Sequence, residues 1–402
     1  MLIKRHISSV LLDLSSQFPV VMLTGSRQVG KTTLLKELDE NRRFVSFDDP
    51  VVRDLALNDP SLFMQTYKPP VLIDEFQYVP QLLPYIKMAV DSQPEVCGQF
   101  WLTGSQQFKM MKGVGESLAG RVVVLPLGGI TQAELSARNA EGPFSTARQL
   151  DPSVAFDGAE TIYERIFRGT YPAVLSGRIR NLRAFYRSYL NTYLERDVRQ
   201  LTAVSNESLF LAFVKVMAAR TGNLLNLSDV ARDVGISQPT AKSWLSILES
   251  SGIVFLLRPY SANLTSRVVK TPKVYFMDTG LCCYLAGWTD SNVLSRGAMN
   301  GSLLETFVVS EVVRSFWNVG EDAPVWFFRD RSGVEIDLLI ERNGTLFPIE
   351  VKRTATPSVS DVRNFKIARQ RGLKLERGAV LCLADHAVPL SDGTLVVPIG
   401  SL

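Results

Sequence analysis

The chain has 402 residues, an apolar fraction of 46% and a net charge of +4, values typical of a globular protein with more than one domain. No apolar run is long enough to cross a bilayer, so we expect no membrane partner. The near-even charge does not by itself indicate nucleic-acid binding. The four cysteines show no metal-ligand spacing, and the sequence therefore favours a cytoplasmic protein.

A phosphate-binding motif follows the apolar run 20–23. Its spacing, G-x-x-x-x-G-K-[ST], is typical of a glycine turn between a strand and a helix, where backbone N–H groups and the helix dipole face a polyphosphate. Lys31 is expected to reach the β- and γ-phosphates of ATP, and Thr32 to place its hydroxyl on Mg²⁺. The residues expected to contact the nucleotide are Gly25, Gln28, Val29, Gly30, Lys31, Thr32 and Thr33.

A second apolar run, 70–73, ends in the adjacent carboxylates Asp74 and Glu75. A parallel strand would place them at the phosphate edge of the sheet. We expect Asp74 to hold the water shell of Mg²⁺. Glu75 is expected to orient or deprotonate the attacking water, because phosphoryl transfer to water needs an aligned nucleophile.

Strands predicted at 43–48 and 100–105 alternate with helical segments, which indicates a parallel sheet covered on both faces. Ligands of such sheets bind at the carboxyl ends of the strands, where Ser105 is expected near the γ-phosphate. Arg121 follows a glycine that closes a helix and faces away from its own nucleotide. It is either a finger for the phosphate of a neighbouring subunit or an ordinary helix-ending arginine.

These motifs together resemble the prokaryotic AAA-type ATPases of the additional-strand class. More narrowly, they are similar to a bacterial and archaeal family that carries a C-terminal domain of unknown function related to PD-(D/E)xK nucleases. The segments that carry the likeness are 27–34, 73–77, 102–105, 118–121, 169–172 and 193–197. The resemblance implies that Ser105 is a sensor and that Arg121 is a finger acting in trans. It also implies a helical lid up to about residue 201, in which Arg178, Arg180 or Arg183 touches the γ-phosphate.

Residues 126–156 predict a loose connection with one short helix, 131–139, capped by Thr131 and Glu134. Residues 209–260 then show helix-turn-helix patterning, with the second helix capped by Ser228 and wing strands at 253–257 and 274–276. DNA contact is expected early in the third helix, although such units also serve as plain assembly modules. The candidate DNA-binding residues are Gln238, Thr240, Lys242 and Ser243.

Two hairpin-linked strands, 333–340 and 346–352, carry Asp337, Glu350 and Lys352. This pattern resembles the D-x(n)-E-x-K core of restriction-type nucleases. Asp337 and Glu350 would share Mg²⁺, with Glu305 as a further acid and Lys352 beside a hydroxide or phosphate. The alternative is that this domain, like many relatives of such nucleases, keeps only the fold and does not cleave nucleic acid. Basic residues outnumber acidic ones in 160–200 and in 352–377, which favours contact with a polyanion.

The predicted fold class is α/β with four parts. They are an AAA+ P-loop ATPase core (1–155), a helical lid (156–205), a winged helix-turn-helix (206–268) and a PD-(D/E)xK nuclease-like domain (269–402). The leading functional hypothesis is an ATP-hydrolysing homo-oligomer, a ring and most simply a hexamer, that binds and remodels DNA as a helicase or branch-migration motor. One alternative is a nucleotide-dependent switch that binds a protein partner in signalling or defence. Another is an ATP- and Mg²⁺-dependent nuclease.

Overall fold

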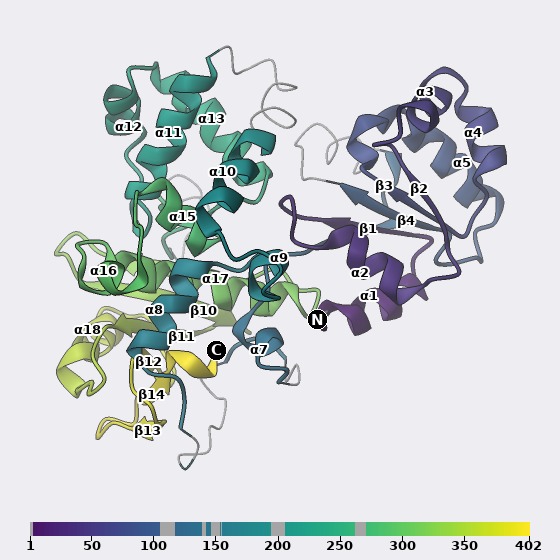
Figure 1. Ribbon diagram of the computed structural model, residues 1–402. Helices are drawn as coiled ribbons and strands as arrows, with labels where there is room; N and C mark the ends of the chain where they lie inside the picture. The colour runs from purple at the N-terminus through teal and green to yellow at the C-terminus, as the bar shows by residue number, and fades with distance from the viewer. Residues whose placement is uncertain are drawn as a thin grey trace.

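The computed structural model describes residues 3–104, 117–138, 142–145, 153, 155–193, 206–261 and 271–402. One lobe contains β1 to β5 with helices α1 to α5, and a second, larger lobe contains the elements from α7 onward (Figure 1). Within the described residues, no helix combines the length and apolar character needed to span a membrane.

The first lobe is built on a parallel sheet with the strand order β2-β3-β4-β1-β5. Its strands are β1 (Val20–Thr24), β2 (Arg43–Ser46), β3 (Val71–Asp74), β4 (Phe100–Gly104) and β5 (Val122–Pro126). Because β4 lies between β1 and β3, the phosphate-loop strand and the Asp74 strand are not neighbours. The sheet therefore contains the additional strand that the family resemblance implied.

Helices cover both faces of this sheet. They are α1 (Ile7–Ser15), α2 (Lys31–Leu38), α3 (Pro50–Asn58), α4 (Pro60–Thr66) and α5 (Leu83–Ser92), with 3-10 turns at Phe76–Tyr78 and Pro80–Leu82. Along β1, Val20 and Met22 pack in the core under α3 to α5, whereas Val21 and Leu23 pack on the side of α1 and α2. Burial on both faces explains why these strands are continuous apolar runs.

After β5, α7 (Gln132–Leu135) lies in the predicted connection. The segment predicted as a lid, called the lid below, contains α8 (Ala159–Arg168), α9 (Pro172–Leu175) and α10 (Leu182–Tyr193). The predicted capping box is confirmed: Thr131 Oγ1 accepts a hydrogen bond from Glu134 N, and Glu134 Oε2 accepts one from Thr131 N. The capped helix ends at Leu135, earlier than predicted, and the last part of the predicted lid lies outside the described residues.

Three helices and a small antiparallel sheet form the next unit. They are α11 (Glu207–Ala219), α12 (Leu227–Val234), α13 (Gln238–Ser250), β6 (Asn223–Leu224), β7 (Val254–Leu257) and β8 (Lys273–Phe276), with the strand order β6-β8-β7. The predicted cap of the second helix is wrong. The side chain of Asn226, not that of Ser228, accepts the hydrogen bonds from the first turn of α12. Strand β8 belongs to this unit although it begins beyond the predicted boundary at residue 268.

The C-terminal part packs a long helix against a mixed sheet with the order β13-β14-β12-β11-β10-β9. The helices are α15 (Thr279–Leu285), α16 (Ser291–Arg296), α17 (Asn300–Trp317) and α18 (Arg363–Gln370), with 3-10 turns at Val359–Val362 and Ile399–Ser401. The strands are β9 (Val325–Arg329), β10 (Glu335–Arg342), β11 (Thr345–Lys352), β12 (Ala379–Cys382), β13 (Val388–Pro389) and β14 (Leu395–Pro398). The predicted hairpin corresponds to β10 and β11, which pair in antiparallel register.

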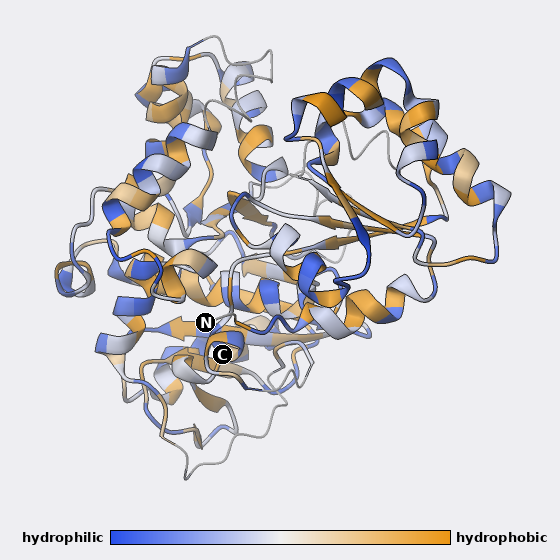
Figure 2. Ribbon diagram, turned by 45° about the vertical axis from the view of Figure 1, so that its right-hand side comes forward, coloured by the Kyte–Doolittle hydropathy of each residue, from blue (hydrophilic) through white to orange (hydrophobic). Residues whose placement is uncertain are grey.

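One hydrophobic core runs through both lobes. It extends from Ile7 in α1 to Leu402 and includes residues of the phosphate-loop helix, the lid, the three-helix unit and the C-terminal sheet. Helix α17 crosses the middle of the larger lobe (Figure 1), and most of its residues are buried. Figure 2 shows hydrophobic segments along the strands of both lobes. The parts predicted as separate domains are therefore packed together, so a shift in one of them changes the packing of its neighbours.

Candidate ATP site and its surroundings

The phosphate loop has the backbone shape that its sequence predicts. Gly25 has a φ of 149°, and a Cβ on it would lie 2.1 Å from Leu127 O, so only glycine fits there. Gly30 has a φ of 95° and precedes α2, whose first residue is Lys31. Gln28 adopts φ 63°, in the left-handed region that non-glycine residues rarely occupy. Strain at this position is typical of a functional loop.

Lys31 folds back over its own loop. Its side chain is buried, and Nζ donates hydrogen bonds to Gly25 O and Ser26 O, both at 2.9 Å. The ammonium thus lies within the ring of the loop, where phosphate oxygens would compete with the two carbonyls for it. This position agrees with the predicted role of Lys31.

Asp74 lies where two threonine hydroxyls meet. Thr32 Oγ1 donates to Asp74 Oδ1 at 2.7 Å, and Thr103 Oγ1 donates to the same oxygen. The structure thus brings Thr32 and Asp74 together as predicted. Thr103 was not predicted as a site residue. It reaches Asp74 because β4 is the direct neighbour of β3.

Glu75 follows β3 in a left-handed conformation with φ 56°. Its N–H donates to Thr103 Oγ1 at 3.4 Å, and its carboxylate accepts a hydrogen bond from Gln77 Nε2. Burial raises the pKa of Glu75. A raised pKa increases the affinity of the carboxylate for a proton near neutral pH, which suits the base predicted here.

Arg121 lies at the opposite end of the sheet from the phosphate loop. It directly precedes β5, whose first residue, Val122, pairs with Val20 at the start of β1. The length of β5 alone separates the two ends by about 13 Å. Arg121 forms an ion pair with Asp91 in α5 and is partly exposed. It therefore does not reach the nucleotide site of its own chain. Ser105, which was also predicted to be catalytic, lies outside the described residues.

The lid and the three-helix unit both approach the phosphate loop. A Cβ on Gly30 would lie 3.8 Å from Pro172 Cγ, and a Cβ on Gly252 would lie 3.6 Å from Ser26 N. A cavity of about 30 Å³ remains between these parts, lined by residues of the loop, the connection after β5, the lid and the turn after α13. This volume suffices for about two water molecules. The lid arginines Arg178, Arg180 and Arg183 are exposed, and no ion pair involves them within the described segments.

Asp278 fixes the lid at this cavity. Its carboxylate accepts hydrogen bonds from Thr170 N at 2.6 Å, Thr170 Oγ1 at 2.7 Å and Tyr186 OH at 3.1 Å. It also accepts one from Leu281 N, which caps α15. A second link joins Tyr193 OH to Ser251 Oγ at 2.8 Å, next to Gly252 in the turn that approaches the loop. The lid and the three-helix unit are thus tied to each other beside the phosphate loop.

A buried polar network connects the loop to helix α17. Arg5 donates to Val29 O at 2.9 Å and to Gly128 O at 2.8 Å, and it forms an ion pair with Glu134 at 3.1 Å. Burial alone would raise the pKa of Glu134, but Arg5 and backbone donors outweigh it and lower this pKa. The network reaches the phosphate loop and the connection after β5 from one side.

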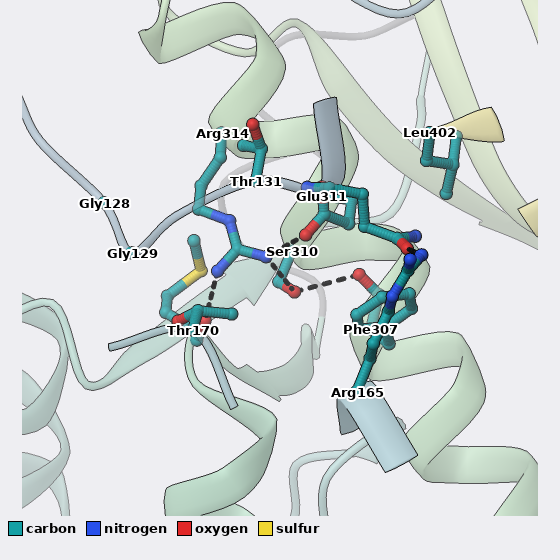
Figure 3. A network of polar contacts seen from close by, with 12 residues as sticks. Gly128, Gly129, Thr131, Arg165, Thr170, Phe307, Ser310, Glu311, Arg314 and Leu402 are labelled. Carbon is teal, nitrogen blue, oxygen red and sulfur yellow. Dashed lines mark hydrogen bonds and ion pairs between the residues drawn. The ribbon is translucent and has the colours of Figure 1, made fainter. Parts of the chain in front are cut away.

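Helix α17 holds the same connection from the other side (Figure 3). Arg314 donates to Glu311 at 2.6 Å and to Met277 O at 3.1 Å, and Glu311 accepts from Gln132 N at 3.0 Å. A Cβ on Gly128 would lie 2.8 Å from Arg314 Cδ, so the connection passes tightly over this arginine. These contacts could not be predicted from the sequence, because they join residues far apart in the chain.

Comparison with known proteins identifies the family. Residues 17–136 match an AAA domain, and residues 159–292 and 300–402 match two domains of unknown function, DUF8612 and DUF4143. An uncharacterized protein of Mycobacterium tuberculosis is 31% identical over 382 residues, which cover 94% of this chain and 80% of the relative. A relative in Mycobacterium bovis gives the same values.

The chain belongs to a family of AAA ATPases. Among solved structures, a Walker-type ATPase of Pyrococcus abyssi aligns with a TM-score of 0.45 at 15% identity, over 71% of this chain and 96% of that one. The described geometry around Lys31, Thr32, Asp74 and Glu75 accounts for the ATPase assignment in chemical terms.

The predicted metal ligands of the C-terminal part are only partly assembled in this ATPase. Glu305, Asp337 and Glu350 lie close enough that the negative charge of Asp337 adds to burial in raising the pKa of Glu305, to about 7, and of Glu350, to about 8. Within the described residues, however, no three His, Cys, Asp or Glu side chains are placed to hold a metal ion. Lys352 donates to Glu350 Oε1 at 2.6 Å.

The predicted DNA-binding residues lie on the surface of α13. Gln238, Lys242 and Ser243 are exposed, and Thr240 is half-buried. The charge there is not positive overall, because α12 and α13 together carry two basic and three acidic side chains. These five residues are Arg232, Lys242, Asp229, Asp233 and Glu249. The surface thus lacks the excess of basic residues that binding to a phosphate backbone favours.

Proposed function

We propose that this ATPase hydrolyses MgATP and uses the bound nucleotide to set the position of its lid and three-helix unit. The observation that carries the proposal is the close approach of both parts to the phosphate loop, with Pro172 beside Gly30 and Gly252 beside Ser26 around one small cavity. A triphosphate adds volume and negative charge at this place. Different arrangements of the lid and the three-helix unit therefore bind the triphosphate with different affinities. A ligand of this kind shifts the equilibrium between the arrangements.

The residues of the site divide the chemistry among them. Lys31 exchanges its two loop carbonyls for phosphate oxygens when ATP enters. Thr32 and Asp74 supply the hard oxygen atoms that would hold Mg²⁺, which contributes charge neutralisation when bound with ATP. Glu75 orients the attacking water and takes its proton, and Thr103 holds Asp74 and the backbone of Glu75 in line.

The position of Arg121 supports a homo-oligomer. This side chain lies at the edge of the sheet away from its own phosphate loop and is partly exposed. We propose that it enters the ATP site of a neighbouring copy, as in a ring, and stabilises the charge that develops on the transferred phosphoryl group.

DNA is a second candidate partner, favoured by the exposed arginines of the lid. Arg178, Arg180, Arg183 and Arg187 are all exposed, and none of them forms an ion pair with another described residue. The three-helix unit, which we interpret as a winged helix from its helices and its antiparallel strands, then serves mainly as the moving part. A helicase-type motor should hydrolyse ATP several-fold faster with duplex, single-stranded or branched DNA at low salt. A switch for a protein partner should hydrolyse at one rate with all of them.

Hydrogen exchange measures the proposed movement directly. We expect the segment 247–257 and the lid segment 170–176 to change their exchange rates when ATP binds to the Glu75→Gln variant, which should retain ATP. The Lys31→Ala variant, which should not bind ATP, is the matched control and should show no change. Identical exchange in both segments with and without ATP, in protein shown to bind it, would contradict the proposal.

A further inference from the structure

A buried group of charged side chains lies where the three-helix unit meets the C-terminal sheet. Lys273 of β8 has a side-chain exposure of only 5%, and its Nζ lies 3.0 Å from Glu305 Oε1 in α17 and 2.6 Å from Glu335 Oε1 in β10. Tyr275, also in β8, donates its hydroxyl to the same oxygen of Glu305. Strand β8 thus inserts an ammonium and a phenol among carboxylates of the neighbouring part.

Two further carboxylates complete the group. Asp337 Oδ2 accepts a hydrogen bond from Val351 N at 2.9 Å, and Glu350 Oε1 accepts one from Lys352. The other oxygen of Glu350 is buried and has no hydrogen-bond partner within the described residues. Lys273 is the most buried cation of the group, because the side chain of Lys352 is 32% exposed.

The electrostatics identify Lys273 as the main counter-charge. Burial alone would lower the pKa of Lys273, but the negative charges of Glu305, Asp337 and Glu335 outweigh it and raise this pKa. The ammonium therefore stays protonated at neutral pH. Carboxylates are the ligands that Mg²⁺ prefers, and a Mg²⁺ ion bound by these acids would have to displace Lys273 from at least Glu305.

We propose that Lys273 is a built-in counter-ion that takes the place of the divalent cation, so that the acid cluster of Glu305, Asp337 and Glu350 does not bind Mg²⁺ while β8 is in this position. The residues implied by the nuclease resemblance are thus present, but their arrangement does not fit a bound metal ion. The proposal also accounts for the finding that no three acids among the described residues are set around a common point. It is independent of what ATP hydrolysis drives.

Binding of Mn²⁺ to the full chain without nucleotide tests the proposal, with free Mn²⁺ followed by electron paramagnetic resonance. All proteins carry Asp74→Asn, which removes a carboxylate of the ATP site. The parent protein, which retains Lys273, should show no Mn²⁺ site that depends on Asp337. Lys273→Met should gain one such site and bind Mn²⁺ there at least about ten-fold more tightly than any residual binding in the parent, because a positive charge has left the cluster. Adding Asp337→Asn should remove that site again.

Two variants complete the test. Lys273→Arg keeps the charge and should gain no site. The double variant Lys273→Met/Glu335→Gln removes one charge from each partner of this ion pair. It is used in place of Lys273→Met if that single variant does not fold. An Asp337-dependent Mn²⁺ site in the protein with native Lys273 would overturn the proposal. So would a folded variant without Lys273 that binds no more Mn²⁺ than its parent.

Discussion

Replacement of Thr103 by valine is the most selective test of the ATP site, because valine keeps the shape of threonine and removes only its hydroxyl. That hydroxyl donates to Asp74 and accepts a hydrogen bond from Glu75 N. A hydrogen bond to a charged group contributes about 1.5–3 kcal/mol. Since the alignment of Asp74 and Glu75 matters most in the transition state, we expect kcat to fall about 10- to 150-fold.

The assay is phosphate release at saturating ATP, together with a titration of nucleotide affinity. Affinity should stay within about two-fold of wild type, because the lost interaction acts on the chemical step. Thr306→Val is the matched control: its hydroxyl is equally buried, bonds Ser302 O at 2.6 Å and lies in α17, away from the ATP site. A Thr103→Val enzyme with wild-type kcat would refute the role of Thr103.

Four further predictions concern single sites. The kcat should rise as the pH rises through the raised pKa of Glu75, because only the deprotonated carboxylate accepts a proton. The Glu75→Gln variant should bind ATP without turnover. Wild-type turnover in this variant would exclude Glu75 as the base. Arg121→Ala should lose hydrolysis and regain part of it when mixed with Glu75→Gln subunits, since mixed interfaces then hold one intact site; no recovery would argue against a shared site. Arg314→Met should lower the free energy of unfolding in urea by about 3–5 kcal/mol, because it leaves Glu311 buried without its counter-charge. The double variant Arg314→Met/Glu311→Leu should recover most of this loss. An equal loss in the single and the double variant would show that the unpaired charge of Glu311 is not its cause. Plasmid incubated with Mg²⁺ and ATP should stay intact with wild type and with Lys352→Ala alike, whereas cleavage by wild type alone would restore the nuclease interpretation.

Local sequence was sufficient for the phosphate loop and for the acids after β3. Both motifs lie at the end of an apolar strand, and their geometry depends mainly on residues next to them, such as Gly25 and Gly30. The capping box at Thr131 was predictable for the same reason. At α12 the sequence analysis named Ser228 as the cap, and only the backbone shows that the helix begins at Leu227 with Asn226 as its cap.

The remaining site residues could not be predicted, because their roles come from packing between distant segments. Thr103 acts on Asp74 through the placement of β4 beside β3, which is a property of the sheet. Lys273 meets Glu305 only because β8 of one part is packed against α17 of another. The nuclease-like pattern predicted Glu305, Asp337 and Glu350, but neither Glu335 nor the ammonium of Lys273 that pairs with it.

The central claim is that nucleotide at the phosphate loop moves the three-helix unit. A distance measured between spin labels tests it most directly, one on α5 at the exposed Met88→Cys and one on α13 at the exposed Ser246→Cys, in a Cys97→Ser background whose other cysteines are buried. We predict that the distance distribution differs between the ADP-bound protein and the ATP-bound Glu75→Gln variant, and that Lys31→Ala shows no difference. One unchanged distribution in every nucleotide state would contradict the account.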